Sequence, residues 1–207
     1  MDKPEKFWNK LADRYSRHPV ADQATYRKKL EITQSYCRPD MEVLEFGCGT
    51  GTTAIHHAPF VKHILATDFS SEMIRICRDK AQAAGIDNVD FRCSSFDDLD
   101  STTASFDMVL GLNILHLMDN WEEVSVRAYT MLRPGGVFIT STGCVGDTIF
   151  RLFTFIVPIG RFLGLLPQLK VISQKQLEQS IKDAGFVIDY LWRPKKYAAV
   201  FIVAKKT

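Results

Sequence analysis

Short apolar runs alternate with longer stretches of helical spacing along most of the chain. The apolar runs occur at residues 41–46, 63–68, 88–93, 106–112 and 135–142. Between the second and the third, residues 70–85 have helical spacing, with Ser70 or Ser71 as the candidate N-cap and Gly85 as the closing residue. Strands that alternate with helices predict an α/β fold, with a mostly parallel sheet that is covered on both faces.

The second half of the chain predicts further elements and departs from strict alternation. A helix is expected over residues 121–136, ended by Pro134 and the two glycines that follow it. Another helix is expected over residues 173–186. The runs 186–192 and 197–206 then form a strand pair at the C-terminus, which brings the predicted strands to seven.

Two segments lie outside this alternation. Residues 1–37 look helical and lead into the first strand, so we expect an N-terminal helical cap. Residues 144–172 form an apolar insertion, with no acidic residue between Asp147 and Glu178. Neither segment could easily form a core alone. We therefore expect both to pack over strand ends within a single domain of residues 1–207, with the insertion acting as a lid.

Composition and charge narrow the class of protein. The chain has 207 residues, 46% of them hydrophobic, which suits one α/β domain and excludes a disordered chain. The formal net charge is only +2. Because nucleic-acid binding normally requires a clustered basic face, we expect no nucleic-acid partner.

The cysteines and the apolar runs indicate the compartment. Five cysteines are widely spaced without a CxxC pair, which argues against a disulfide framework or a zinc site, and we expect no metal. The N-terminus is charged and lacks the apolar core of a signal peptide, so we expect a cytoplasmic protein. The interrupted apolar runs within residues 144–172 are shorter than the ~20 residues that cross a bilayer, so we expect no transmembrane segment. Peripheral membrane contact stays open as an alternative, and the oligomeric state is not specified.

A glycine-rich loop follows the first predicted strand, and an acidic residue ends the second. The loop reads EFGCGTG over residues 45–51, and Asp68 comes 21 positions after its first glycine. Glycines permit positive φ and let backbone N–H groups approach a ligand closely. A carboxylate at the place of Asp68 can accept from both hydroxyls of a ribose. Because the spacing is GxGxG rather than GxGxxG, and because Glu45 would repel a pyrophosphate, the loop favours an adenosine ligand without phosphates.

These features belong to a longer series of motifs. LEFGCGTG, ATDFSSEMI, SFDMVLGLNILHLM and LRPGGVFI follow one another within residues 40–142. In order and spacing they resemble the successive motifs of the class I S-adenosylmethionine-dependent methyltransferases. The resemblance implies a Rossmann-like, doubly wound sheet with an antiparallel C-terminal strand, and S-adenosyl-L-methionine as the cofactor.

The resemblance also implies which residues hold the cofactor. Those of the glycine loop would lie along its methionine part: Glu45, Gly47, Cys48 and Gly49. Asp68 would hold the ribose, and Phe69 would lie against the adenine. Further contacts are expected from the loop after the third strand, the end of the fourth strand and the N-terminal helices: Ser95, Phe96, Gly111, Leu112 and Tyr15.

Two of these assignments have alternatives. Many relatives carry an Asp at the position of Ser95, where it accepts from the adenine amino group. In this chain the Ser95 hydroxyl or the nearby Asp97 would have to serve. Tyr15 resembles a tyrosine that closes over the methionine part, and an aromatic that merely anchors a helix is an equal alternative.

The residues just after the fourth predicted strand are the candidates for catalysis. A sulfonium makes the methyl group a good electrophile, so the protein has to align a nucleophile and exclude water. A thiolate needs no strong base, whereas an alcohol or a protonated amine does. Asn113 and His116 are the candidate catalytic residues, and His116 could accept a proton near neutral pH.

The apolar insertion is the main indication of the acceptor. Arg151, Arg161 and Lys170 punctuate apolar residues there, which favours a dry chamber for a small apolar molecule, with a thiol or sulfide preferred. The alternatives are methylation of a lipid or quinone oxygen or amine, and a non-catalytic sensor that binds the nucleoside. A nicotinamide oxidoreductase is disfavoured by the glycine spacing.

Overall fold

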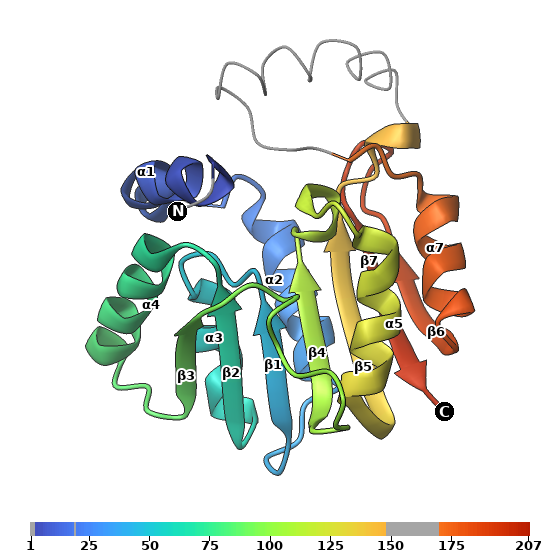
Figure 1. Ribbon diagram of the computed structural model, residues 1–207, viewed down its shortest axis with the longest axis horizontal. Coiled ribbons are helices and arrows are strands. Elements are labelled where there is room, and N and C mark those ends of the chain that lie inside the picture. Colours follow the sequence, from blue (N-terminus) through green and yellow to red (C-terminus); the bar gives the residue numbers. More distant parts are fainter. Residues whose placement is uncertain (1–2, 19, 148–169) are drawn as a thin grey trace.

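The computed structural model describes residues 3–18, 20–147 and 170–207. Its centre is one sheet of seven strands in the order β3-β2-β1-β4-β5-β7-β6 (Figure 1). Strands β1 to β5 are parallel, and β7 runs antiparallel to both of its neighbours. The predicted mostly parallel, doubly wound sheet is confirmed. The strands are β1 (Glu42–Phe46), β2 (His63–Asp68), β3 (Val89–Cys93), β4 (Phe106–Leu112), β5 (Leu132–Thr142), β6 (Phe186–Trp192) and β7 (Val200–Lys206).

Helices cover both faces of the sheet (Figure 1). One apolar core lies under three of them: α2 (Gln23–Gln34), α3 (Thr52–His57) and α4 (Ser71–Ala84). A second core lies under α5 (Trp121–Met131) and α7 (Gln174–Asp183). The N-terminal α1 (Lys3–Arg17) lies across one end of the sheet and packs on α4 through Ala12 and Met73. The described single-turn 3-10 helices are η1 (Ala58–Phe60), η2 (Leu115–Leu117) and η3 (Val145–Asp147).

The two flanking segments differ in how much of them the structure describes. The region expected to form a helical cap, residues 1–37, contains α1 and α2. Residues 148–169, which make up most of the lid predicted at 144–172, lie outside the described residues. Within the described part of the chain, no helix is both long and apolar enough to cross a bilayer.

Side-chain caps fix where two of the helices begin. Ser70 Oγ accepts the backbone N–H of Met73 at 3.2 Å, so the first of the two candidate serines is the N-cap of α4. Gly85 ends this helix in the left-handed conformation, with a φ of 66°. At α7, Ser173 and Gln176 form a reciprocal capping box. Both helices therefore follow the local signals in the sequence.

The end of α5 differs from the prediction. The sequence pattern placed it at Pro134, whereas the helix ends at Met131 and Leu132 already belongs to β5. A proline ring disfavours helical backbone at the residue that precedes it, so the chain leaves the helix before Arg133. Leu132 then pairs with Phe106 of β4. The prediction that this helix reaches residue 134 is therefore wrong.

Strand β6 serves both cores, because its pairing with β7 is irregular. Strict alternation would place Phe186, Ile188, Tyr190 and Trp192 on one face of the sheet. The register shifts between Ile188 and Tyr190. The first two side chains consequently join the core under α5 and α7, and the last two join the core under α2. One extra residue, Asp189, thus lets this strand contribute large side chains to both layers.

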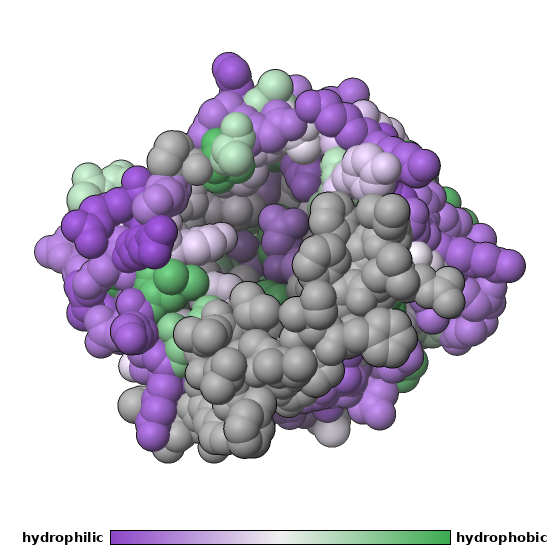
Figure 2. All heavy atoms as spheres, turned by 90° about the horizontal axis from the view of Figure 1, so that it is seen from above, coloured by the Kyte–Doolittle hydropathy of each residue, from purple (hydrophilic) through white to green (hydrophobic). Residues whose placement is uncertain are grey.

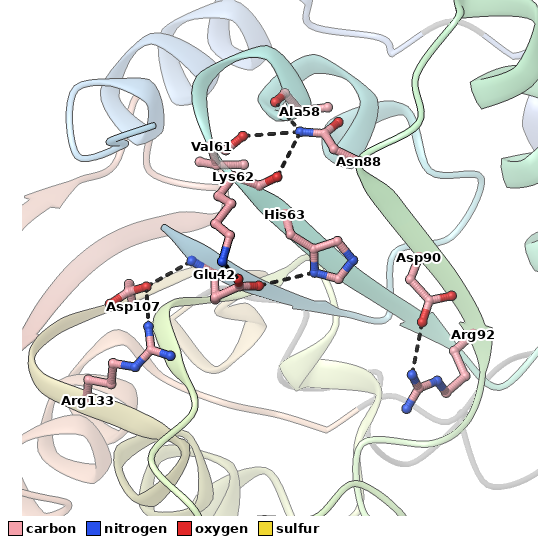
Figure 3. A network of polar contacts seen from close by, with 10 residues as sticks. All are labelled: Glu42, Ala58, Val61, Lys62, His63, Asn88, Asp90, Arg92, Asp107 and Arg133. Carbon is pink, nitrogen blue, oxygen red and sulfur yellow. Dashed lines mark hydrogen bonds and ion pairs between the residues drawn. The ribbon is translucent and has the colours of Figure 1, made fainter. Parts of the chain in front are cut away.

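Polar contacts tie together the amino ends of the central strands (Figure 3). Asp107 accepts the backbone N–H of Glu42 at 2.8 Å and the Arg133 guanidinium at 2.7 Å. Before β3, the side-chain amide of Asn88 donates to the carbonyl oxygens of Ala58 and Val61 at 2.8 and 3.1 Å. These bonds satisfy the backbone of the turn between α3 and β2, at the end of the sheet opposite the glycine loop.

We expect the Asn88→Ala substitution to lower the free energy of unfolding by about 1–3 kcal/mol, because it removes the side-chain donor that the Ala58 and Val61 carbonyl groups share. The matched control is Asp90→Asn, which removes the exposed ion pair between Asp90 and Arg92 (Figure 3). Exposed pairs are worth less than about 1 kcal/mol. Urea unfolding of both variants checks this expectation, and equal losses would contradict it.

Candidate functional site

A cavity of about 1190 Å³ opens at the carboxyl ends of β1, β2 and β4. Residues of α1, of α2, of the glycine loop and of the loop after β3 surround it. The strand order reverses between β1 and β4, which is where ligands bind in open α/β sheets. Seen from above, this face of the molecule is hollowed at its middle, with hydrophilic residues along part of the rim (Figure 2).

The glycine loop forms one wall of the cavity and has left-handed backbone at each glycine. The φ angles of Gly47, Gly49 and Gly51 are 62°, 55° and 73°. A Cβ at Gly47 would stand 2.6 Å from Ile114 Cγ1, so close packing also requires this glycine. Of the described residues, only the ring of Tyr15 would come within 4 Å of a Cβ at Gly49, at 3.8 Å. Gly49 therefore keeps its surface open toward the cavity, beside Tyr15.

The Asp68 carboxylate holds this loop in place. Its Oδ2 accepts the backbone N–H of Gly49 and its Oδ1 that of Ser70, each at 2.9 Å. Burial raises the pKa of Asp68, and these two hydrogen bonds oppose the rise. A carboxylate oxygen has a second lone pair, so Asp68 can still accept from a ligand. The sequence predicted the ligand contact only and missed the structural role.

Glu45 places a second buried acid beside the loop. Its side chain lines the cavity, and its Oε2 has no hydrogen-bond partner among the described residues. Burial raises the pKa of Glu45 to about 8, so the apo protein holds this group largely protonated at neutral pH. A cation bound in the cavity would favour the ionised form. An orphaned acid at this place therefore fits a positively charged ligand.

The loop after β3 contains the two candidate hydrogen-bond acceptors for a ligand, Ser95 and Asp97, and they differ in how free they are to accept. Ser95 Oγ donates to Asp98 Oδ2 at 2.7 Å and accepts the Asp98 backbone N–H, so its hydroxyl is occupied within the turn. Asp97 lines the cavity, and its Oδ1 accepts from the Asn120 amide at 2.9 Å. Its other oxygen remains for a ligand. The geometry therefore favours Asp97 over Ser95 as the residue that accepts a hydrogen bond from a ligand.

The two candidate catalytic residues lie in different settings. Asn113 lines the cavity, and its backbone is in the left-handed conformation, with a φ of 57°. Its backbone N–H donates to the Ser141 carbonyl at 2.7 Å. The His116 ring packs beside Gly143, whose N–H donates to Nδ1 at 3.4 Å. Burial lowers the pKa of His116, so the ring is neutral at physiological pH. Among the described residues His116 does not line the cavity, and its catalytic role stays a prediction.

Most of the residues predicted to hold the cofactor surround this one cavity. Those that line it are Tyr15, Glu45, Gly47, Cys48, Gly49, Asp68, Phe69, Ser95, Phe96 and Leu112. Gly111 is not among the described residues that line the cavity, and a Cβ there would stand 2.4 Å from Phe46 Cζ. Within the described chain, no three His, Cys, Asp or Glu side chains are grouped to hold a metal ion.

Sequence reasoning missed part of the cavity wall. Tyr26 of α2 lines it, and its hydroxyl lies 3.2 Å from Thr53 Oγ1. Lys80 of α4 also lines it and donates to Thr50 and Thr52. The helical spacing around these two residues predicted their helices, and no local pattern marked them as site residues.

Comparison with known proteins gives consistent matches. Residues 43–136, slightly less than half of the chain, match the methyltransferase domain family. The chain is 27% identical over 110 residues to the uncharacterized methyltransferase YcgJ of Bacillus subtilis, covering 53% of this chain and 44% of that protein. It is 28% identical over 152 residues to the ubiquinone biosynthesis O-methyltransferase of Parvibaculum lavamentivorans, covering 70% and 58% respectively. The chain thus spans about half the length of these relatives.

The fold comparison agrees with the sequence matches. A SAM-dependent methyltransferase structure from Methanosarcina mazei superposes with a TM-score of 0.69 at 20% identity. The superposition covers 84% of this chain and 96% of that one. A likeness at this identity establishes the fold.

We expect the stability of the ligand-free protein to fall as the pH rises through about 8, because folding keeps Glu45 protonated. The folded-state pKa lies above the ordinary value near 4.3, so this contribution is complete at acid pH and is lost at alkaline pH. Between about pH 6 and about pH 9 the loss should be roughly 2–3 kcal/mol. Urea unfolding of the wild type and of Glu45→Gln checks this.

The Glu45→Gln variant keeps the shape of the side chain and removes its titration. Its stability should decline less steeply with pH, and the remaining slope includes Asp68, whose pKa burial also raises. Parallel pH profiles for the wild type and the variant would contradict the role assigned to Glu45.

Proposed function

We propose that this chain, which contains a class I S-adenosylmethionine-dependent methyltransferase domain, transfers a methyl group from that cofactor to a small acceptor. The observation that carries the proposal is the buried carboxyl group of Glu45, whose Oε2 has no hydrogen-bond partner among the described residues and which lies beside an open glycine loop. It fits a ligand that is cationic at one end and carries no phosphate.

The residues around the cavity fit each part of the cofactor. Glu45 would face the cationic methionine end, and Gly49 would leave room for it beneath Tyr15. Asp68 would take the ribose hydroxyls with its remaining lone pairs, and Asp97 would accept from the adenine amino group, with Phe69 against the ring. When bound, the cofactor supplies a methyl group activated by a sulfonium.

The cavity formed by the described residues also has room for an acceptor. Its volume of about 1190 Å³ exceeds the roughly 300–1,000 Å³ typical of a pocket for one small ligand. Ile114, Leu117 and Met118 line it beyond Asn113 and favour an apolar molecule. There the chain would align the acceptor and keep water out. Neutral His116 is our proposed base where the acceptor must lose a proton, and the lid proposed at 144–172 lies mostly outside the described residues.

Several acceptor classes fit this proposal. The apolar residues favour a thiol or sulfide, or the head of a lipid or quinone. The name of the ubiquinone biosynthesis relatives supports an oxygen acceptor. The non-catalytic alternative is a sensor that binds the nucleoside without turnover. A cytoplasmic location, a single domain of residues 1–207 and the absence of a nucleic-acid partner remain part of the proposal.

Methyl transfer is tested directly with cofactor labelled on its methyl group. We expect the wild type to release S-adenosylhomocysteine and to label at least one member of a panel of thiols, phenols and amines. Chromatography of the products identifies the labelled acceptor. Tight binding of the cofactor without turnover on any member would favour the sensor.

We expect Asp68→Ala to weaken cofactor affinity by roughly tenfold to a hundredfold, the effect of losing a charge-assisted hydrogen bond of about 1.5–3 kcal/mol. Calorimetric titration with S-adenosylmethionine measures the change. Because Asp68 also holds Gly49, unfolding is measured in parallel, and Asp68→Asn provides a variant of the same shape. The exposed Asp90→Asn is the control with unchanged affinity. Unchanged affinity in folded Asp68→Ala would remove this residue from the cofactor site.

A further inference from the structure

Three polar side chains from distant parts of the chain form a row that ends at the cavity. Lys29 of α2 donates from Nζ to Ser141 Oγ of β5 at 2.8 Å. Ser141 Oγ in turn donates to Asn113 Oδ1 at 3.0 Å. Asn113 lines the cavity just beyond the end of β4. We call these three residues the relay. The proposed cofactor contacts make no use of Lys29 or Ser141.

The relay has a fixed direction. An ammonium group only donates hydrogen bonds, so the Ser141 hydroxyl accepts from Lys29 and donates its own hydrogen bond to Asn113 Oδ1. This arrangement uses the amide oxygen of Asn113 and leaves the amide nitrogen, which has no hydrogen-bond partner among the described residues. The backbone N–H of Asn113 is bonded to the Ser141 carbonyl as well. Asn113 is therefore held at both its backbone and its side chain, with its donor group left for a ligand.

Among the described residues, no nearby acid balances the charge of Lys29. Its side chain is half-buried, and no carboxylate among the described residues forms an ion pair with it. Asp22 acts on it only from a distance, and burial lowers the pKa of Lys29. A positive charge left unpaired behind a row of donors is suited to an anionic group at the end of that row.

We propose that Lys29 is a positioning residue that orients the amide N–H groups of Asn113 through Ser141, and that the relay thereby selects an acceptor with an ionised oxygen, such as a phenolate or enolate. This inference rests on the proposed function and names its substrate class. Every member of the relay donates, so none acts as a base toward the acceptor. A protonated amine would place its N–H donors next to the N–H donors of Asn113, and its positive charge would be repelled by that of Lys29.

The chemistry of such an acceptor is balanced without a proton transfer. The oxygen forms its bond to the methyl carbon as the carbon–sulfur bond breaks, and the electron pair of that bond stays on sulfur. The negative charge of the oxygen and the positive charge of the sulfonium cancel in the same step. The hydroxyl has already lost its proton to solvent before binding, which an acidic phenol or enol can do without a strong base.

The test compares two matched probes, 4-nitrophenolate and 4-nitroaniline, which share a ring and differ in the acceptor atom. Each is titrated into protein saturated with S-adenosylhomocysteine, at a pH where the phenol is ionised. We expect the wild type to bind the phenolate at least about tenfold more tightly. In Lys29→Met and in Ser141→Ala this preference should fall by roughly tenfold, as for the loss of a charge-assisted hydrogen bond.

The neighbouring Lys28→Met is the control for loss of charge. Its ammonium lies over the Trp192 ring, 4.7 Å from the ring centroid, away from the relay. This variant should keep the preference for the phenolate. Affinity for S-adenosylhomocysteine should stay unchanged in all three variants, which separates positioning of Asn113 from damage to the fold. Ser141→Ala keeps the Lys29 charge and therefore tests the connection even where Lys29→Met unfolds.

The outcomes separate the inference from the proposed function. A wild type that binds S-adenosylhomocysteine and shows no preference for the phenolate overturns the inference alone. The same holds if Ser141→Ala and Lys29→Met keep the full preference. A wild type that does not bind S-adenosylhomocysteine overturns the proposed function, and the inference with it.

Discussion

The hydrogen bonds from the N–H groups of Gly49 and Ser70 to the Asp68 carboxylate fix the glycine loop relative to the end of β2. The loop needs this support because each of its three glycines has left-handed backbone, which the strand before it does not impose. Through Gly49 the same carboxylate determines where the cavity is open, and through Ser70 it determines where α4 begins. One buried charge thus connects the sheet, the first helix after β2 and the wall of the site.

The two buried acids at the site, Glu45 and Asp68, lower the stability of the protein when no ligand is bound. Glu45 and Asp68 are both buried, and burial disfavours the charged form of each. Asp68 is compensated by backbone donors, whereas Oε2 of Glu45 has no partner among the described residues. A buried polar atom without a hydrogen bond is expected where a ligand supplies the missing interaction. The buried acid that is least compensated by hydrogen bonds, Glu45, is therefore the best indication of the ligand's charge.

Much of the fold could be predicted because its signals are local. Apolar runs marked all seven strands, and Ser70, Gly85 and Ser173 marked helix ends through their own hydrogen bonds or backbone conformation. The end of α5 was missed because Pro134 acts on the residue before it. The irregularity at Asp189 was missed because it depends on the packing of β6 against the two cores, one on each face of the sheet, and not on a local sequence signal. In the site, the glycines and Asp68 follow a short motif, whereas Lys29 meets Ser141 across 112 positions, which no local pattern encodes.

The position of α1 bears on how long a ligand stays bound. Residues of this helix line the cavity. The helix packs on α4 through a small apolar cluster of Ala12, Met73 and Ile76, which is separate from the two main cores. Elements held by few apolar contacts open at lower free energy than the domain unfolds. We therefore expect the dissociation rate of a nucleoside to follow the local opening of α1 rather than the stability of the sheet. Residence time and global stability would then vary independently in this protein.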